Sequence, residues 1–259
     1  MEPQSSKAQL RSRVRTARAN RARVSPVNPA HAAGADPTGT EADPSHKVGA
    51  DPSRTEEDPS YTAGADPSRT EAVPGVGASV ADTTWEVIRA ADARVVLGYA
   101  ALPGEPDLDP ALDRFLAAGG TVYLPVVTKV GEPLAFGEVT GSMASLEPQG
   151  KWGIREPADG VELLTAAQLL SPEVGLDLLF IPALGFGADG ARLGNGGGFY
   201  DRTFGPHGVA PLDHGGGVLG VCFTEELGLS GLTAEEWDLR IPSAITEDGV
   251  HTFTGEQRP

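Results

Sequence analysis

Nearly continuous apolar runs alternate with helix-like segments from Trp85 onward. Apolar residues on one face predict helices over 83–92 and 109–120, and the second ends in a glycine pair typical of a helix C-terminus. Four short apolar runs predict strands, at 94–100, 121–127, 177–186 and 217–223. Because runs of this kind are buried on both sides, we expect an α/β fold with a mostly parallel sheet. Residues 250–254 predict an edge strand.

The first segment with helical periodicity lies at the N-terminus, over residues 5–24. Leu10, Val14 and Ala17 recur at helical spacing, and arginines occupy the other faces. This basic amphipathic helix has two interpretations. It is either a solvated surface helix, which the pattern by itself favours, or a helix that docks and lends Lys or Arg to a site.

Between this helix and the strands, a fifteen-residue repeat occupies 34–78 in three copies rich in Pro, Gly, Asp, Ser and Thr. A repeat that stacks needs an apolar face, and this one has none, so we expect a disordered acidic insertion. The predicted organisation is therefore a basic helix over 1–24 that packs on the body, a disordered insertion over 25–79 and an α/β domain over 80–259.

Charge is unevenly distributed along the chain, whose formal net charge is −16. Residues 1–23 carry seven basic residues and one acidic residue, whereas residues 79–259 carry ten basic and 26 acidic residues. An acidic body argues against nucleic-acid binding, so any anion must be held by a few local cations. The single cysteine, Cys222, lies in an apolar run and is interpreted as a core thiol. With no membrane-length apolar stretch and no secretory signal, we expect a cytoplasmic protein, acting as a monomer.

The stretch "GARLGNGGGFYDR", residues 190–202, directly follows the third predicted strand. It is neither a P-loop, which needs Gly-Lys-Ser/Thr, nor a dinucleotide fingerprint, because Phe199 stands where the last glycine should be. Its glycines can still let backbone N–H groups converge on an anion. Arg192 can clamp phosphate oxygens, and Asp201 can bind Mg²⁺. The alternative is a glycine-rich surface hairpin with Asp201 exposed on a helix.

Several ordered motifs resemble the 5-formyltetrahydrofolate cyclo-ligase (methenyltetrahydrofolate synthetase) family. They are "KAQLR" (7–11), "YAALPGEPDLDPAL" (99–112), "GGTVYLPVV" (119–127), "KWGIREP" (151–157), "DLLFIPALGFGADGARLGNGGGFYDR" (177–202) and "LTAEEWDLRIPSAITEDGV" (232–250). The resemblance implies a three-layer α/β/α sandwich. It also implies ATP- and Mg²⁺-dependent cyclisation of the small molecule 5-formyltetrahydrofolate to 5,10-methenyltetrahydrofolate, through a phosphorylated formyl group, with release of ADP and phosphate.

The resemblance also implies roles for individual residues. The positions that match ATP-binding ones are Lys7, Ala8, Gln9, Leu10, Arg11, Arg192, Leu193, Gly194, Asn195, Gly196, Gly197, Gly198, Phe199 and Tyr200. The positions that match folate-binding ones are Ala100, Glu105 and Trp152. Asp201 matches a Mg²⁺ ligand and Asp238 a second one, while Arg192 and Asn195 are the expected catalytic residues.

Two departures from the family pattern concern charge in the loop. Many members have Arg where this chain has Asn195 and Lys where it has Gly197, so the loop loses up to two cations. These departures leave open a relative that binds folate or nucleotide without turnover. A further alternative is an isomerase or transferase acting on a sugar phosphate or CoA ester, which would need no ATP and would leave "KAQLR" unexplained.

Overall fold

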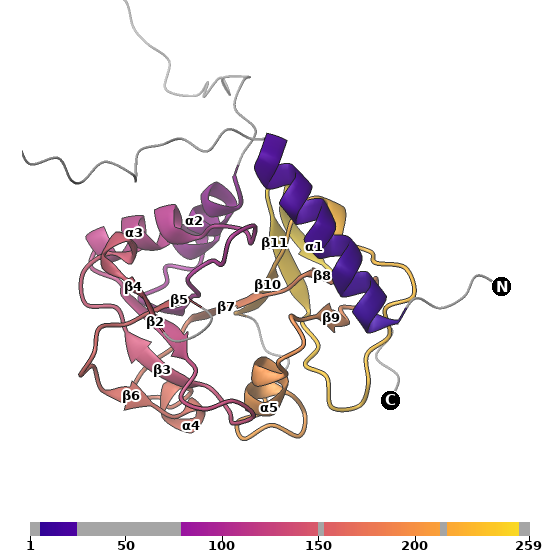
Figure 1. Cartoon of the computed structure of the whole chain (residues 1–259). Helices are drawn as coiled ribbons and strands as arrows, with labels where there is room; N and C mark the ends of the chain where they lie inside the picture. The colour runs from indigo at the N-terminus through magenta and orange to yellow at the C-terminus, as the bar shows by residue number, and fades with distance from the viewer. Residues whose placement is uncertain (1–5, 25–78, 150–152, 213–216, 254–259) are drawn as a thin grey trace, which may run out of the picture. The chain divides into compact units, whose positions relative to one another are not determined.

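The computed structural model of the chain (Figure 1) describes residues 6–24, 79–149, 153–212 and 217–253. Residues 25–78 of the predicted insertion and Trp152, a predicted folate-binding residue, lie outside the described residues. No helix in the described part of the chain is long and apolar enough to cross a membrane.

Local residues explain where the helices begin and end, because they bond the free backbone N–H groups at the start or allow the chain to turn away at the end. Helix α2 (Val80–Ala90) begins with a capping box, in which the Ser79 hydroxyl accepts from the N–H of Asp82 and the Asp82 carboxylate accepts from the N–H of Ser79. Helix α3 (Asp109–Ala117) has a proline in its first turn. The chain leaves α3 at Gly119, whose φ of 88° lies in the left-handed region that glycine adopts without strain.

Eight strands of the described chain form one sheet, in the order β12-β11-β10-β7-β1-β2-β3-β6. The inner strands β11, β10, β7, β1 and β2 pair in parallel, whereas β12, β3 and β6 pair antiparallel. The strands of this sheet are β1 (Val95–Leu97), β2 (Thr121–Val126), β3 (Ala135–Glu138), β6 (Leu163–Leu164), β7 (Leu178–Pro182), β10 (Val218–Val221), β11 (Ser243–Thr246) and β12 (Gly249–Thr252). The predicted mostly parallel α/β sheet is thus confirmed.

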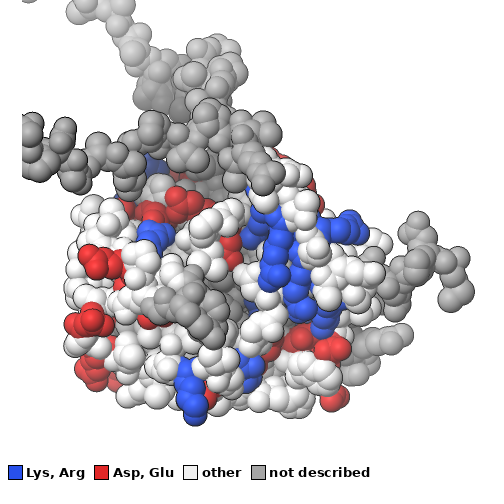
Figure 2. Space-filling view, viewed as in Figure 1, with Lys and Arg blue, Asp and Glu red and all other residues white. Residues whose placement is uncertain are grey.

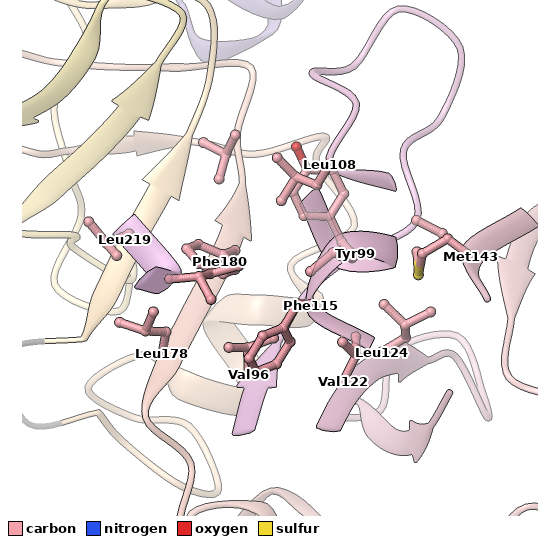
Figure 3. Close-up of a cluster of buried hydrophobic side chains, with 14 of the residues drawn as sticks. Val96, Tyr99, Leu108, Phe115, Val122, Leu124, Met143, Leu178, Phe180 and Leu219 are labelled. Carbon is pink, nitrogen blue, oxygen red and sulfur yellow. The ribbon is translucent and has the colours of Figure 1, made fainter. Parts of the chain in front are cut away.

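Alternate residues of the central strands supply two cores, one on each face of the sheet. On one face Val96, Phe180 and Leu219 pack against side chains of α2 and α3 (Figure 3). On the other face Leu97 and Ile181 pack with Phe204, which belongs to helix α5 (Phe199–Phe204). Helix α4 (Ala166–Leu169) joins this second core. Burial of each large side chain contributes about 1.5–3 kcal/mol, so both faces of the sheet have to be covered.

Smaller elements surround the main sheet. Strands β4 (Glu147–Gln149) and β5 (Ile154–Glu156) form one hairpin, and β8 (Gly185–Phe186) and β9 (Arg192–Leu193) form another. The 3₁₀ turns are η1 (Met143–Ser145) and η2 (Thr224–Glu226). The prediction of a single strand over 177–186 is therefore wrong. The chain leaves the sheet after Pro182, and the Leu184 N–H donates to the carbonyl of Leu193 at 2.7 Å.

The N-terminal helix α1 (Lys7–Val24) lies against the β8–β9 hairpin, with Leu10 and Val14 buried beside Leu193. The third buried position is Arg18, which replaces the predicted Ala17; Ala17 is exposed. The solvated interpretation of this helix is therefore wrong for the face that carries these residues. One face of α1 is docked, and it buries a guanidinium as well as apolar side chains.

Candidate functional site

A cavity of about 1010 Å³ opens at the carboxyl ends of the parallel strands. Tyr99 and Ala100 follow β1, Pro182 ends β7, and Val127 follows β2; all four line the cavity. The strand order reverses between β1 and β7, because the chain runs from β1 to β2 on one side and then through β7, β10 and β11 on the other. Ligands of open α/β sheets bind at such a reversal, outside the carboxyl ends of the strands.

The glycine-rich loop forms one wall of this cavity, between β9 and α5. Gly196 and Gly198 have φ values of 96° and 65°, which other residues adopt only with strain. At Gly197, a Cβ atom would lie 2.9 Å from the ring of Phe199. The path of the loop therefore favours glycine at 196 and 198, and a side chain at 197 would require the Phe199 ring to shift. The main chain of the loop borders the open space of the cavity.

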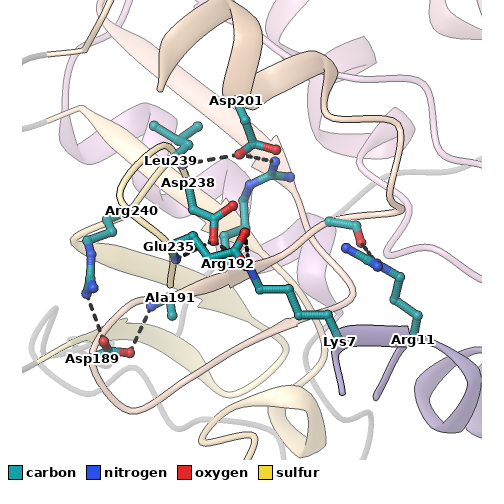
Figure 4. A network of polar contacts seen from close by, with 11 residues as sticks. Lys7, Arg11, Asp189, Ala191, Arg192, Asp201, Glu235, Asp238, Leu239 and Arg240 are labelled. Carbon is teal, nitrogen blue, oxygen red and sulfur yellow. Dashed lines mark hydrogen bonds and ion pairs between the residues drawn. The ribbon is translucent and has the colours of Figure 1, made fainter. Parts of the chain in front are cut away.

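Helix α1 forms the adjoining part of the wall with residues spaced four apart, so that they share one face of the helix. The Lys7 ammonium contacts the Asp238 carboxylate at 2.5 Å, and the Arg11 Nε donates to the carbonyl of Gly194 at 2.9 Å (Figure 4). Arg15 Nη2 donates to the backbone and side-chain oxygens of Asn195, at 2.9 and 3.2 Å. Three side chains of one helix thus reach the loop and the C-terminal segment.

The cavity wall is more basic than the body around it. Counting only the residues that the structure describes, it carries six Lys or Arg and four Asp or Glu side chains. Half of these cations, Lys7, Arg11 and Arg15, come from α1, and Figure 2 shows Lys and Arg side chains gathered along this helix. An acidic chain therefore has one concave surface suited to an anion, provided that α1 is docked.

Arg192 and Asp201 form an ion pair at the inner end of the loop, with 3.1 Å between Nη2 and Oδ1 (Figure 4). Arg192 Nη1 donates to the carbonyl of Pro182 at 3.2 Å, and its side chain is only 5% exposed. The guanidinium lies 5.3 Å from the ring centre of Tyr200, and burial raises the pKa of that phenol well above its ordinary value. Arg192 therefore lines the cavity while contacts with Pro182, Asp201 and Tyr200 hold its side chain in place.

The two predicted metal ligands border the same part of the cavity. Asp201 Oδ1 accepts from the N–H of Leu239, the neighbour of Asp238, and Asp238 Oδ2 accepts from the N–H of Glu235 and from Lys7. No cluster of three or more His, Cys, Asp or Glu side chains suited to a metal occurs in the described ranges. Two carboxylates nonetheless fit Mg²⁺, which takes one or two protein carboxylates and completes its shell with phosphate oxygens and water.

Asn195 connects the glycine loop to the loop after β1. Its side-chain Nδ2 donates to Glu105 Oε1 at 3.0 Å, while the other oxygen of Glu105 accepts from the N–H of Leu102 at 3.1 Å. The same amide accepts from Arg15 through Oδ1. One predicted catalytic residue therefore joins a predicted nucleotide-binding wall to a predicted folate-binding carboxylate.

Some predicted site residues do not line the cavity. Leu10 and Leu193 are buried in the small core under α1, so they support the predicted nucleotide-binding wall from behind and do not line the cavity. Ala8 and Gln9 are exposed on α1 and do not line the cavity, and the Gln9 side-chain oxygen accepts a hydrogen bond from the N–H of Ser6. The other described candidates lie on the cavity: Lys7, Arg11, Ala100, Glu105, Arg192, Gly194, Asn195, Gly196, Gly197, Gly198, Phe199, Tyr200, Asp201 and Asp238.

Sequence reasoning missed several lining residues, among them Arg15, Tyr99, Arg155 and Trp237. Arg15 carried a signal that could have found it, because it follows Arg11 by one helical repeat of four. Arg155 comes from β5 and pairs with Asp109 at the start of α3, and only the fold brings these two together. Trp237 is half exposed and adjoins Asp238, but nothing in the local pattern separates it from an ordinary surface residue.

Comparison with known proteins gives one consistent result. Residues 76–247 match the 5-formyltetrahydrofolate cyclo-ligase family. The chain belongs to this family. The resemblance found in the sequence is thus confirmed, although helix α1 precedes the matched residues.

Relatives in the family agree over most of their length. The 5-formyltetrahydrofolate cyclo-ligase of Escherichia coli K12 is 30% identical over 61% of this chain and 80% of its own. That of Mycolicibacterium smegmatis is 32% identical over 59% and 73%. The solved structure of the 5,10-methenyltetrahydrofolate synthetase of Aquifex aeolicus superposes with a TM-score of 0.50 at 23% identity, covering 70% of this chain and 84% of its own, and supports the fold.

Proposed function

We propose that the cavity catalyses the ATP-dependent cyclisation of 5-formyltetrahydrofolate to 5,10-methenyltetrahydrofolate, with release of ADP and phosphate. Membership in the family supports this reaction. The single observation that carries the proposal is the 3.0 Å hydrogen bond from Asn195 to Glu105. It joins an anion-binding wall to a second wall that offers a carboxylate, and both border one cavity large enough for two ligands.

The nucleotide lies along the glycine loop and helix α1 in this proposal. Backbone N–H groups of Gly196, Gly197 and Gly198 face the polyphosphate, because no Cβ stands between them and the cavity. Lys7 and Arg11 flank the loop from α1, and the Arg192 guanidinium closes it from the sheet side. Charge-assisted hydrogen bonds of this kind are roughly twice as strong as neutral ones.

Asp201 and Asp238 hold Mg²⁺ when the nucleotide is bound. Each keeps one carboxylate oxygen without a hydrogen-bond partner among the described residues, Oδ2 of Asp201 and Oδ1 of Asp238. The metal supplies charge neutralisation at the phosphates. Arg192 and Lys7 neutralise these two carboxylates in the free protein, and both cations lie beside the proposed phosphate site, where they would donate to phosphate oxygens.

The folate occupies the other half of the cavity, with Glu105 as its polar anchor and Ala100 at the end of β1 beside it. The walls here are apolar, with Leu102, Val127 and Leu134 on the lining. Apolar walls exclude water, and a hydrogen-bond acceptor inside them is stronger and more selective than it would be in water. When folate binds, the Glu105 carboxylate accepts a hydrogen bond from an N–H group of the pterin, which replaces the one from Asn195.

Positioning and charge neutralisation account for the chemistry. The formyl oxygen attacks the terminal phosphorus, the bond to the bridging oxygen breaks, and ADP departs with that electron pair. The second folate nitrogen, an N–H amine, then attacks the activated formyl carbon and loses its proton to the leaving phosphate, and the bond from that carbon to the phosphate oxygen breaks, so that hydrogen phosphate departs with the electron pair. No side-chain nucleophile is needed. Arg192, Asn195 and the loop amides donate to the oxygens on which charge develops, which is where a preorganised site lowers the barrier.

The test is the absorbance of the methenyl product with and without ATP. We expect product only when ATP, Mg²⁺ and 5-formyltetrahydrofolate are all present, with stoichiometric phosphate release. Product without ATP would overturn the proposed reaction. Binding of both ligands without product would favour the alternative of a non-catalytic relative, which Asn195 and Gly197 leave open.

We further infer that the small-molecule folate is the partner of this site and that no nucleic acid is. Net acidity of the chain supports the second statement. Action as a monomer and residence in the cytoplasm stay predictions.

A further inference from the structure

Arg15 is a cation of the cavity wall to which neither the family motifs nor the proposed reaction assigns a role. It lies on the same face of α1 as Lys7 and Arg11, one helical repeat of four residues further from the N-terminus. Its side chain is exposed to the cavity and bonds the loop only through Nη2. Within the described residues, Nε and Nη1 of Arg15 have no hydrogen-bond partner and remain available to a ligand.

The place of Arg15 along the cavity is set by its contacts. The α1 side chains run in order from Lys7 beside Asp238, through Arg11 beside Gly194, to Arg15 beside Asn195. Asn195 in turn reaches Glu105, on the predicted folate wall. The order of contacts therefore places Arg15 at the junction of the two walls, beyond the loop glycine that Arg11 contacts.

The helix cannot easily rotate Arg15 away from this junction. Arg18, three residues further on, makes two hydrogen bonds of 2.7 Å to Glu226 and one of 2.7 Å to the carbonyl of Ala183, both outside α1. Leu10 and Val14 are buried on the same docked side. The backbone at Arg15 is thus held by buried side chains before it and by the Arg18 contacts after it. Only the exposed guanidinium of Arg15 can change its hydrogen-bond partners.

We infer that Arg15 contacts the terminal phosphate of the bound nucleotide and stays with that phosphoryl group as it passes to the formyl oxygen. This inference rests on the proposed function. Arg15 remains protonated throughout and donates hydrogen bonds; the phosphorus–oxygen bond to ADP breaks as the bond to the formyl oxygen forms. At this junction a charged donor binds the phosphoryl group that is transferred. Lys7 and Arg11 instead bind the phosphates that remain in ADP.

The experiment compares Arg15→Ala with Arg13→Ala, which removes the same charge from an exposed position of the same helix. Calorimetry measures the affinity of each protein for ATP and for ADP, and initial rates give kcat. We expect Arg15→Ala to weaken ATP binding by about 10- to 150-fold, as for one charge-assisted hydrogen bond, and to leave ADP binding unchanged. Arg13→Ala should match the wild type for both nucleotides.

Three results overturn the inference. ATP affinity that does not change, an equal loss for ATP and ADP, or an equal loss in Arg13→Ala would each remove Arg15 from the terminal phosphate. Arg15→Lys, which keeps a charge but loses the fork, should recover part of the ATP affinity. A wild-type protein that binds ATP but forms no methenyl product would contradict the proposed function alone, because the ATP-to-ADP contrast still tests Arg15 there. A wild-type protein that binds neither nucleotide overturns both.

Discussion

Arg18 of the N-terminal helix and Glu226 of the turn after β10 form a buried, two-pronged ion pair across 208 positions of sequence. Both side chains are about 5% exposed or less. Burial lowers the pKa of Arg18, but the hydrogen bonds and charge of Glu226 outweigh it, so the net shift is upward. This pair sits beside the carbonyl of Ala183 and holds α1, with its three cavity-facing cations, on the body.

Arg18→Ala should lower the free energy of unfolding by about 3–5 kcal/mol, because Glu226 is left as an uncompensated buried charge. Urea unfolding at constant pH measures it. Arg89→Ala, which breaks an exposed pair with Glu86, is the matched control and should cost at most about 1 kcal/mol. The double variant Arg18→Met with Glu226→Leu removes both charges and should recover most of the loss. Equal midpoints for Arg18→Ala and Arg89→Ala would show that the pair contributes nothing.

Arg192→Ala should reduce both turnover and stability. Its guanidinium donates to Asp201 and to the carbonyl of Pro182, so the variant removes the ionic partner of Asp201 and a donor to Pro182, at about 1–3 kcal/mol of unfolding free energy. We expect a rate loss of about 10- to 150-fold for the lost contact to phosphate. Arg192→Lys keeps the charge and should recover part of the rate. Melting temperature and kcat are measured together, and a fall in stability at unchanged kcat would place Arg192 outside the chemistry.

Asp201→Asn should raise the Mg²⁺ concentration needed for half-maximal rate, because an amide keeps the shape of the carboxylate but not its charge. Initial rates against Mg²⁺ concentration measure it. Asp189→Asn is the control: Asp189 also pairs with an arginine, Arg240, but it lies outside the cavity lining. Superimposable curves for Asp201→Asn and wild type would contradict the metal role.

Gly196→Ala should weaken ATP binding as well as stability, whereas Gly119→Ala should affect stability alone. The two residues have similar φ values, 96° and 88°, so an alanine suffers a similar strain of roughly 1–2 kcal/mol at each. A Cβ at Gly196 would point toward Arg11, 3.5 Å from Nε, and one at Gly119 would meet open space. ATP titration of both variants separates the effects, and equal ATP affinities would show that the loop does not cradle phosphate.

The Cys222 thiol should be inert in the folded protein. Burial raises its pKa well above the ordinary value, so at pH 8 the thiol stays protonated and lacks the nucleophilic thiolate. A chromogenic disulfide reagent should react with one equivalent of thiol in denaturant and hardly at all without it. Rapid stoichiometric reaction of the native protein would contradict this expectation.

Local patterns predicted a large part of this fold because they report burial. The runs that became β1, β2, β7 and β10 are apolar on both faces, and only a strand covered on both sides of a sheet needs that composition. The sequence alone missed β11, an inner strand, because "SAIT" is short and follows Pro242. It also missed β3 and β6, two short strands that pair antiparallel at one end of the sheet, where β6 is the edge strand.

Local patterns were enough to show that a glycine loop follows a buried strand, that Arg192 and Asp201 flank this loop, and that the chain resembles a cyclo-ligase. Each of these features is predicted by glycine or apolar residues that lie within a few positions of one another in the sequence. The same patterns could not show that Arg18 is buried and Ala17 exposed, since both residues fit the helical spacing from Val14. A buried guanidinium is stable only where a carboxylate is close enough to pair with it. Glu226 is far from Arg18 in the sequence, and only folding brings the two together. The same holds for Asn195 and Glu105, which lie 90 positions apart and within one hydrogen bond.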